Sequence, residues 1–232
     1  LPIYYYVTPG HQVPTGVTMS SARRRQLLEH AARHDAVIIE DDYDSESNFT
    51  LNPLPALKAS DRRGRVVYVS SLSKALSPGL RLGFMVADPD LIDEARALRR
   101  LVYRHPPTNI QYQMAHFLAQ GHYETHLRRY HYDSAQRWER LHAALQRYLP
   151  SCRALAGSEH ANAFWLQTPA QINTQQLTWR AAHAGVLIEP GARHFLNAAP
   201  PDNYFRMGFH AINPDAIAQG GEVLRGQLEQ MG

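Results

Sequence analysis

Two short runs of mostly β-branched residues, Val37-Ile38-Ile39 and Val66-Val67-Tyr68-Val69, are apolar almost without interruption. Such runs are typical of strands in a parallel sheet that is covered on both faces, because neither face then meets water. The pattern predicts an α/β fold with a mainly parallel sheet between helices, and functional residues are expected at the carboxyl ends of the strands. The predicted elements are strands over 3–7, 36–40, 65–70 and 82–87, and helices over 20–34 and from Leu91.

The chain is expected to fold as three consecutive parts. Residues 1–108 form part of a large domain that carries the parallel sheet. Residues 109–149 have no strand pattern and are broken by Gly121, which indicates helices that join two halves. Residues 150–232 are expected to form a small α+β domain. Its predicted elements are strands over 163–166, 186–188 and 204–209, a helix over 174–184 and a closing helix from Pro214.

The composition narrows the class of protein. The net charge is only +3, and the basic residues are spread along the chain rather than gathered in a nucleic-acid-binding tail. Cys152 is the only cysteine, so no intramolecular disulfide can form, and a cytoplasmic protein is expected. No apolar run approaches the roughly 20 residues that cross a bilayer, so no membrane contact is expected. Because the chain opens on a predicted strand without a methionine, Leu1 is interpreted as a cut in a longer protein.

A lysine lies in a stretch rich in Ser, Pro and Gly that follows the predicted strand over 65–70. Lys74 is there near the carboxyl edge of the sheet, where a desolvated lysine can act as an amine nucleophile toward an aldehyde. Ser71, Ser73 and Arg81 supply hydroxyl and guanidinium groups that could hold a phosphate beside it. The simpler alternative is a surface turn with a solvated lysine.

An acidic cluster, residues 40–46, ends the predicted strand over 36–40. A pyridine ring that serves as an electron sink needs a carboxylate beside its protonated nitrogen. Asp41, the first residue after the strand, is the candidate, and Tyr43 would hydrogen-bond the phenolic oxygen of the same ring. Two alternatives stay open at this point: a site for Mg²⁺ or Ca²⁺, which clustered carboxylates suit, and a plain acidic loop.

An arginine interrupts the last predicted strand. Arg206 lies in the run Tyr-Phe-Arg-Met-Gly-Phe at 204–209. Such an arginine can bind a carboxylate through two parallel hydrogen bonds. By itself, an arginine in this setting is more often half-exposed or salt-bridged.

The order of these segments resembles that of fold-type I aminotransferases, which depend on pyridoxal 5'-phosphate (PLP). The resemblance covers essentially the whole chain. It implies that Lys74 forms the Schiff base with the cofactor. It also implies that Arg206 binds the α-carboxylate of the substrate.

The loop over 7–16 is similar to the aminotransferase loop that ends in Asn-Pro-Thr-Gly beside the cofactor ring, but Val13 stands at the position of the asparagine. An apolar side chain cannot donate a hydrogen bond to the cofactor oxygen, which argues against ordinary transaminase chemistry. His11 and Gln12 are the candidates to replace that donor, although either could instead pack or cap the turn.

Three motifs are worded like those of MocR-type transcriptional regulators, in which a modified aminotransferase module is joined to an N-terminal winged helix-turn-helix domain. They are Thr-Pro-x-His-Gln-x-Pro-Thr-Gly at 8–16, Ile-Glu-Asp-Asp-Tyr-Asp-Ser-Glu at 39–46 and Gly-His-Tyr-Glu-Thr-His-Leu-Arg-Arg at 121–129. The third is similar to the interdomain helix of that family. This demotes a zinc site at His122 and His126, whose i, i+4 spacing would otherwise suit one, and no metal is expected.

The resemblance implies parts that lie outside this chain. In the family, the glycine-rich helix start that binds the cofactor phosphate, the aromatic residue that stacks on its ring and the DNA-binding domain all precede the position of Leu1. Because a helix N-terminus is a strong phosphate site, we expect this chain to bind PLP weakly or not at all and its parent protein to bind PLP well. The family builds its site between two subunits, so a homodimer is expected by analogy.

Two functions follow from the resemblance. The first is a PLP-binding module that senses an amino acid or a vitamer for a MocR-type regulator, with DNA contacted only by a domain outside this chain. The second is a free-standing aminotransferase that acts on an amino acid and a 2-oxo acid and uses Lys74 as general acid and base. The wording of the motifs and Val13 favour the regulator. A Rossmann-like binding module ranks behind both, because no Gly-x-Gly-x-x-Gly follows a predicted strand.

Overall fold

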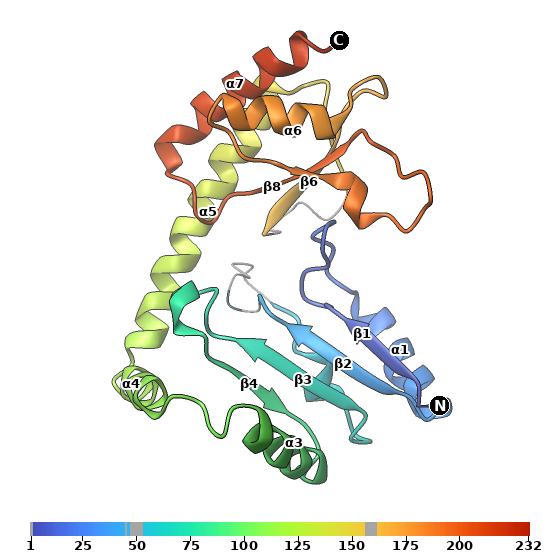
Figure 1. Cartoon of the computed structure of the whole chain (residues 1–232), viewed down its shortest axis with the longest axis vertical. Coiled ribbons are helices and arrows are strands. Elements are labelled where there is room, and N and C mark those ends of the chain that lie inside the picture. Colours follow the sequence, from blue (N-terminus) through green and yellow to red (C-terminus); the bar gives the residue numbers. More distant parts are fainter. Residues whose placement is uncertain (1, 45, 47–52, 156–161) are drawn as a thin grey trace. The chain divides into compact units, whose positions relative to one another are not determined.

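The computed structural model describes residues 2–44, 46, 53–155 and 162–232. They form two compact units (Figure 1), the first with residues 2–12 and 18–131 and the second with residues 13–17 and 132–232. The boundary lies inside helix α5 (His122–Tyr148), which follows α4 (Thr108–Ala119) after a turn at Gly121. Gly121 has a φ of +70°, a conformation that glycine adopts without strain, and the predicted break in the long helical stretch is confirmed.

The first unit is built on a sheet with the strand order β1-β2-β3-β4. Strands β1 (Tyr4–Val7), β2 (Val37–Asp42) and β3 (Val66–Ser71) are parallel, as predicted, and β4 (Gly83–Val86) runs antiparallel to β3. The connection from β3 to β4 contains only the short 3-10 helix η2 (Pro78–Leu80). A parallel return needs a longer crossover, usually a full helix, so the chain turns back along the edge of the sheet.

One face of this sheet packs against helix α1 (Ser21–Arg33) and the short helix α2 (Leu57–Ser60). Ala31 of α1, Leu57 of α2 and Ile38 of β2 are almost completely buried in the core between them. Periodic apolar positions on α1 and the apolar run of β2 therefore meet, as the α/β pattern predicts.

The other face carries exposed aromatic side chains, since successive residues of a strand point to opposite faces. Tyr4 and Tyr6 of β1 are 59% and 65% exposed. Helix α3 (Pro89–Val102), which follows β4, has no buried residue, and Leu101 is 84% exposed. In the described part of the chain, the core cluster of this sheet lies on the face that packs against α1 and α2.

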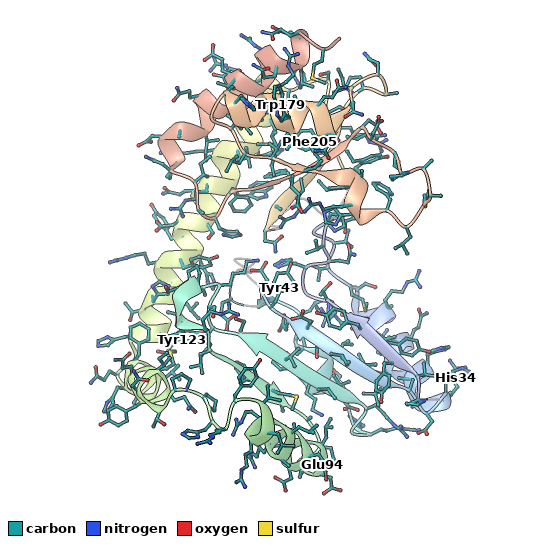
Figure 2. All side chains as sticks on the ribbon, in the orientation of Figure 1. His34, Tyr43, Glu94, Tyr123, Trp179 and Phe205 are labelled. Carbon is teal, nitrogen blue, oxygen red and sulfur yellow. The ribbon has the colours of Figure 1, made fainter. Side chains whose placement is uncertain are left out.

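The second unit has an antiparallel sheet with the order β5-β6-β8-β7, together with the C-terminal part of α5 and the helices α6 and α7 (Figure 1). Leu177 of α6, Leu224 of α7 and Phe205 of β8 are fully buried in its core, whereas Trp179 on the outer side of α6 is 65% exposed (Figure 2). This is the predicted α+β arrangement. The elements are β5 (Arg153–Ala154), β6 (Ala163–Gln167), α6 (Thr174–His183), β7 (Glu189–Pro190), η3 (Gly191–His194), β8 (Tyr204–Gly208), η4 (Pro214–Ala216) and α7 (Ile217–Glu229).

The strand predicted over 186–188 is wrong. The Val186 backbone N–H donates to the Ala181 carbonyl (2.8 Å) and so helps to end α6, while Leu187 is 85% exposed. The strand of this region is β7, two residues long, in which Glu189 pairs with Arg206 of β8. In the described ranges, no helix is both long enough and apolar enough to span a membrane.

Candidate functional site

Three loops meet at one edge of the first sheet, because the carboxyl ends of parallel strands share an edge. The loop after β1 carries His11, the segment after β2 carries Tyr43 and Asp44, and the loop after β3 carries Lys74. Figure 2 shows Tyr43 just beyond the end of β2. Ser45 of the acidic motif lies outside the described residues. The predicted site residues of the first unit therefore lie on or next to this edge.

Asp44 is the acidic residue that contacts Lys74. The Lys74 Nζ lies 2.7 Å from the Asp44 Oδ1, and the His11 Nδ1 lies 3.5 Å from the Asp44 Oδ2. The Asp44 and His11 side chains are only 2% and 4% exposed, and Lys74 is 34% exposed. Sequence reasoning assigned no role to Asp44, and the only signal that could have pointed to it is its place in the acidic run at the end of β2.

Tyr43 borders the lysine from another side. Its ring centroid lies 4.5 Å from the Lys74 Nζ, a distance at which a cation is attracted to an aromatic face. The Tyr43 hydroxyl donates to the His11 carbonyl over a long 3.4 Å. The side chain thus connects the loops that follow β1 and β3.

The neighbours Asp41 and Asp42 point to opposite faces of β2. Asp42 points to the helix-covered face, where its Oδ2 accepts from the Tyr68 hydroxyl (2.8 Å) and burial raises the pKa of its carboxyl. Asp41 points to the less covered face and accepts a hydrogen bond from Tyr6, which raises the pKa of Tyr6 to about 12. The Asp42 side chain thus lies on the helix-covered face of the sheet, whereas the Asp41 side chain lies on the less covered face.

The loop between β3 and β4 is closed at its base. The Leu72 N–H donates to the Leu82 carbonyl (3.0 Å), which extends the β3–β4 ladder by one bond and brings the backbone of Arg81 back toward Ser71 and Ser73. The Ser73 N–H donates to the Ser71 Oγ (3.2 Å). Arg81 has a φ of +48°, in the left-handed region that non-glycine residues seldom adopt. The two hydroxyls and the guanidinium that were predicted to hold a phosphate are therefore carried by one short closed loop.

Helix α5 supports this edge from within the same unit. The His126 Nε2 lies 2.7 Å from the carbonyl of Ala75, the residue after Lys74. The Tyr123 hydroxyl donates to the Glu46 Oε1 (2.8 Å), and burial together with this bond raises the pKa of Tyr123. His126 therefore contacts a backbone carbonyl. Among the described residues, no group of three or more His, Cys, Asp or Glu side chains is placed to hold a metal ion.

A buried arginine holds the loop that carries His11. Arg24 of α1 is 8% exposed and donates to the carbonyls of Pro9 (2.9 Å), Met19 (2.9 Å) and Pro55 (2.8 Å). Burial lowers the pKa of Arg24, and the negative charges of Glu40 and Asp42 oppose that shift. Because the loop between Pro9 and Met19 lacks regular structure, these bonds fix where it begins and ends.

The second unit contains Arg206, the predicted carboxylate-binding residue. Its Nη1 lies 3.4 Å from the Glu189 Oε2, and the Glu189 Oε1 also lies 3.6 Å from Arg193 and 3.5 Å from His194. The Glu189 carboxylate thus lies within 3.6 Å of three basic side chains. Sequence reasoning did not identify this residue. Val13 belongs to the short segment grouped with this unit and is 38% exposed.

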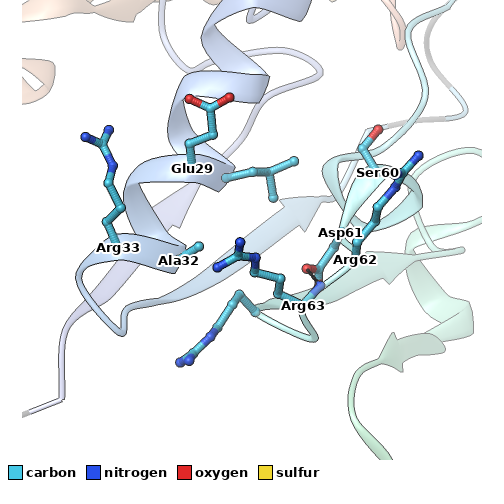
Figure 3. Close-up of a pocket in the computed structure, with 9 residues that line it drawn as sticks. Glu29, Ala32, Arg33, Ser60, Asp61, Arg62 and Arg63 are labelled. Atoms are coloured by element: carbon cyan, nitrogen blue, oxygen red, sulfur yellow. Dashed lines mark hydrogen bonds between the residues drawn. The ribbon is translucent and has the colours of Figure 1, made fainter.

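A basic pocket of about 500 Å³ lies at the opposite, amino-terminal edge of the first sheet (Figure 3). It is formed by the second half of α1 and the turn before β3. Its charged lining consists of Glu29, Arg33, Asp61, Arg62, Arg63 and Arg65. None of the predicted site residues contributes to it.

The chain is similar to known proteins over most of its length. The family model described as aminotransferase class I and II matches residues 7–212. The HTH-type transcriptional regulator TauR of Rhodobacter capsulatus is 39% identical over 215 residues, which cover 92% of this chain and 44% of TauR. The probable rhizopine catabolism regulatory protein MocR of Rhizobium meliloti is 34% identical over 225 residues, which cover 97% of this chain and 45% of that protein.

The fold of the chain is also similar to that of a solved aminotransferase structure. An α-aminoadipate aminotransferase from Thermus thermophilus, complexed with N-(5'-phosphopyridoxyl)-L-leucine, superposes with a TM-score of 0.87 at 27% identity. The match covers 98% of this chain and 59% of that enzyme. This chain spans a little under half the length of the two regulators.

Proposed function

Because this chain belongs to the aminotransferase class I and II family, we propose that it is the PLP-binding, ligand-sensing module of a MocR-type transcriptional regulator. The observation that carries the proposal is the placement of Lys74, a partly exposed amine that a buried carboxylate holds at the carboxyl edge of a parallel sheet. The similarity to TauR and MocR over more than nine-tenths of the chain supports the regulatory assignment.

The residues at this edge suit PLP in kind, and the further phosphate-binding and ring-stacking groups that the family resemblance implies would come from outside this chain. When bound, PLP supplies an aldehyde that condenses with amines and a protonated ring that withdraws electrons. Lys74 would attach the cofactor, Asp41 would pair with the ring nitrogen, and Tyr43 would contact the phenolic oxygen. The phosphate would lie against Ser71, Ser73 and Arg81, and His11 would border the ring.

Attachment at Lys74 can be tested directly because the chain has only two lysines, Lys58 and Lys74. The protein would be saturated with PLP, reduced with borohydride, digested and analysed by mass spectrometry. We expect the pyridoxyl group on Lys74 and not on Lys58, whose Nζ donates to the Val66 carbonyl at the other end of β3. Equal labelling of both lysines, or visible PLP absorbance that survives Lys74→Ala, would contradict this role.

Arg206 would bind the carboxylate of the ligand through a bidentate pair. The chemistry of the site suits an amino acid, or a vitamer that carries an aldehyde or amine. The remaining parts of the proposal concern the longer protein: a cytoplasmic homodimer whose DNA contacts come from a domain outside this chain. Electrophoretic mobility shifts of operator DNA, with and without the ligand, would test the regulatory part.

The second candidate is an aminotransferase, which the similarity to the Thermus enzyme favours. In that case Lys74 would also act as the general acid and base that takes the proton from the α-carbon of the amino acid. The two candidates differ in turnover. A sensor binds an amino acid without releasing a 2-oxo acid, and a coupled assay for 2-oxo acid release over many equivalents would decide between them.

A further inference from the structure

The carboxylate of Asp44 joins two side chains from two other loops. Its Oδ1 lies 2.7 Å from the Lys74 Nζ, and its Oδ2 lies 3.5 Å from the His11 Nδ1. A carboxylate that is 2% exposed is strongly destabilised unless partners compensate for the lost water. At Asp44 this compensation comes from nitrogen atoms, with Lys74 beside one carboxylate oxygen and His11 beside the other.

These contacts fix a side chain that is flexible by nature. Lysine ends in a point charge on a four-carbon stem with many rotamers. At Lys74 the ammonium is bordered by Asp44 and by the face of the Tyr43 ring, with the Nζ 4.5 Å from the ring centroid. Because the Lys74 side chain is 34% exposed, a ligand that enters from solvent can still reach the nitrogen.

We propose that Asp44 is the positioning residue for Lys74: it holds the reacting nitrogen at the carboxyl edge of the sheet until an aldehyde ligand arrives, and His11 holds Asp44 in turn. The inference rests on the proposed function only in taking PLP as that aldehyde. Asp41 and Asp44 then have separate tasks. Asp41 faces the other side of β2 with Tyr6, and Asp44 restrains the lysine.

The test uses an acetylating reagent, which reacts only with a nitrogen whose lone pair is free. Lys74 must leave the Asp44 carboxylate before its nitrogen can attack the reagent, so the Asp44 contact should slow acetylation of Lys74. Asp44→Asn is expected to raise the acetylation rate of Lys74 by about two- to fivefold, the range for a partly exposed charge contact. Lys58, read in the same mass spectrum, serves as the internal reference and should change by less than about twofold.

Two further variants complete the design. Asp35→Asn removes an exposed acid that pairs with Arg65 and should leave both lysines unchanged. Asp44→Glu keeps the carboxylate and should restore much of the protection of Lys74. An unchanged Lys74 rate in a folded Asp44→Asn protein would overturn the proposal.

If the Asp44→Asn protein does not fold, Lys58 and Lys74 will both be acetylated at the rate of the denatured chain, and the mass spectrum will show this. In that case His11→Gln decides, because it leaves Asp44 in place and removes its second partner. A faster Lys74 in this variant supports the proposal, and an unchanged Lys74 contradicts it. The acetylation contains no PLP, so a failure of PLP to label Lys74 contradicts the proposed function separately and leaves the result for Asp44 intact.

Discussion

Glu189 and Arg206 face each other across the β7–β8 ladder, with the Arg206 Nη1 3.4 Å from the Glu189 Oε2. The arginine that is proposed to bind a ligand carboxylate is therefore already paired with a carboxylate of its own chain. The Arg206 side chain is 21% exposed and the Glu189 side chain is 34% exposed, so a carboxylate in solution can reach the guanidinium. An incoming carboxylate must compete with Glu189 for this guanidinium.

The first prediction concerns this competition. Glu189→Gln should strengthen the binding of propionate, a simple carboxylate probe, by about two- to fivefold, because the internal competitor loses its charge. NMR titration of the arginine side-chain signals would measure the affinity. Arg206→Ala should abolish the effect, and Glu222→Gln, which removes an exposed acid on α7, is the matched control. A loss of affinity in Glu189→Gln would instead assign Glu189 to holding Arg206 in place.

The second prediction concerns Arg24 and the loop that carries His11. Arg24→Ala removes hydrogen bonds to the carbonyls of Pro9, Met19 and Pro55 and leaves those carbonyls without their partner. The free energy of unfolding should fall by about 2–4 kcal/mol. Urea denaturation measures this change, and Arg25→Ala, at an exposed neighbour on α1, should change it by less than about 0.5 kcal/mol. If Arg24→Ala and Arg25→Ala lowered the free energy of unfolding equally, Arg24 would not be holding the loop that carries His11.

The third prediction contrasts two glycines. A Cβ at Gly83 would lie 2.6 Å from the Ser70 carbonyl oxygen, so Gly83→Ala must push β3 and β4 apart at the base of the Lys74 loop. It should destabilise the fold by about 1–3 kcal/mol. Gly226 lies within α7 with nothing inside 4 Å of an added Cβ, so Gly226→Ala should stabilise by about 0.5–1 kcal/mol. Urea midpoints that move in the same direction for both would contradict this reading.

The fourth prediction concerns Cys152 and pH. Burial raises the pKa of the Cys152 thiol from about 9 to about 11, so far less of the reactive thiolate is present at pH 8. Its reaction with a disulfide reagent should be about 100-fold slower in the folded protein than in urea. Since burial disfavours the charged form, the contribution of this thiol to stability is complete below about pH 9 and is lost as the pH rises to about 11. Equal rates in the folded and denatured chain would show that the thiol is not shielded.

Much of this architecture follows from the sequence because the signals involved are local. An apolar, mostly β-branched run such as Val66 to Val69 favours a strand of a parallel sheet, and a lysine in the loop that follows it is expected near the carboxyl edge of that sheet. The order of Asp41, Lys74 and Arg206 along the chain likewise indicates the family without any coordinates. Each of these motifs is recognised from residues that are close in sequence.

The remaining features depend on which distant side chains meet. Periodicity cannot show that β4 returns antiparallel, or that Val186 is used to end α6 while β7 forms only at Glu189. Nor can it choose between the two acids at the end of β2, because Asp41 and Asp42 differ by one position and so point to opposite faces of the sheet. The sequence alone determined that a lysine stands among acids and hydroxyls at a sheet edge. Only the tertiary structure decided that Asp44 contacts it, because loop geometry determines which of several like charges comes within hydrogen-bonding distance of a flexible amine.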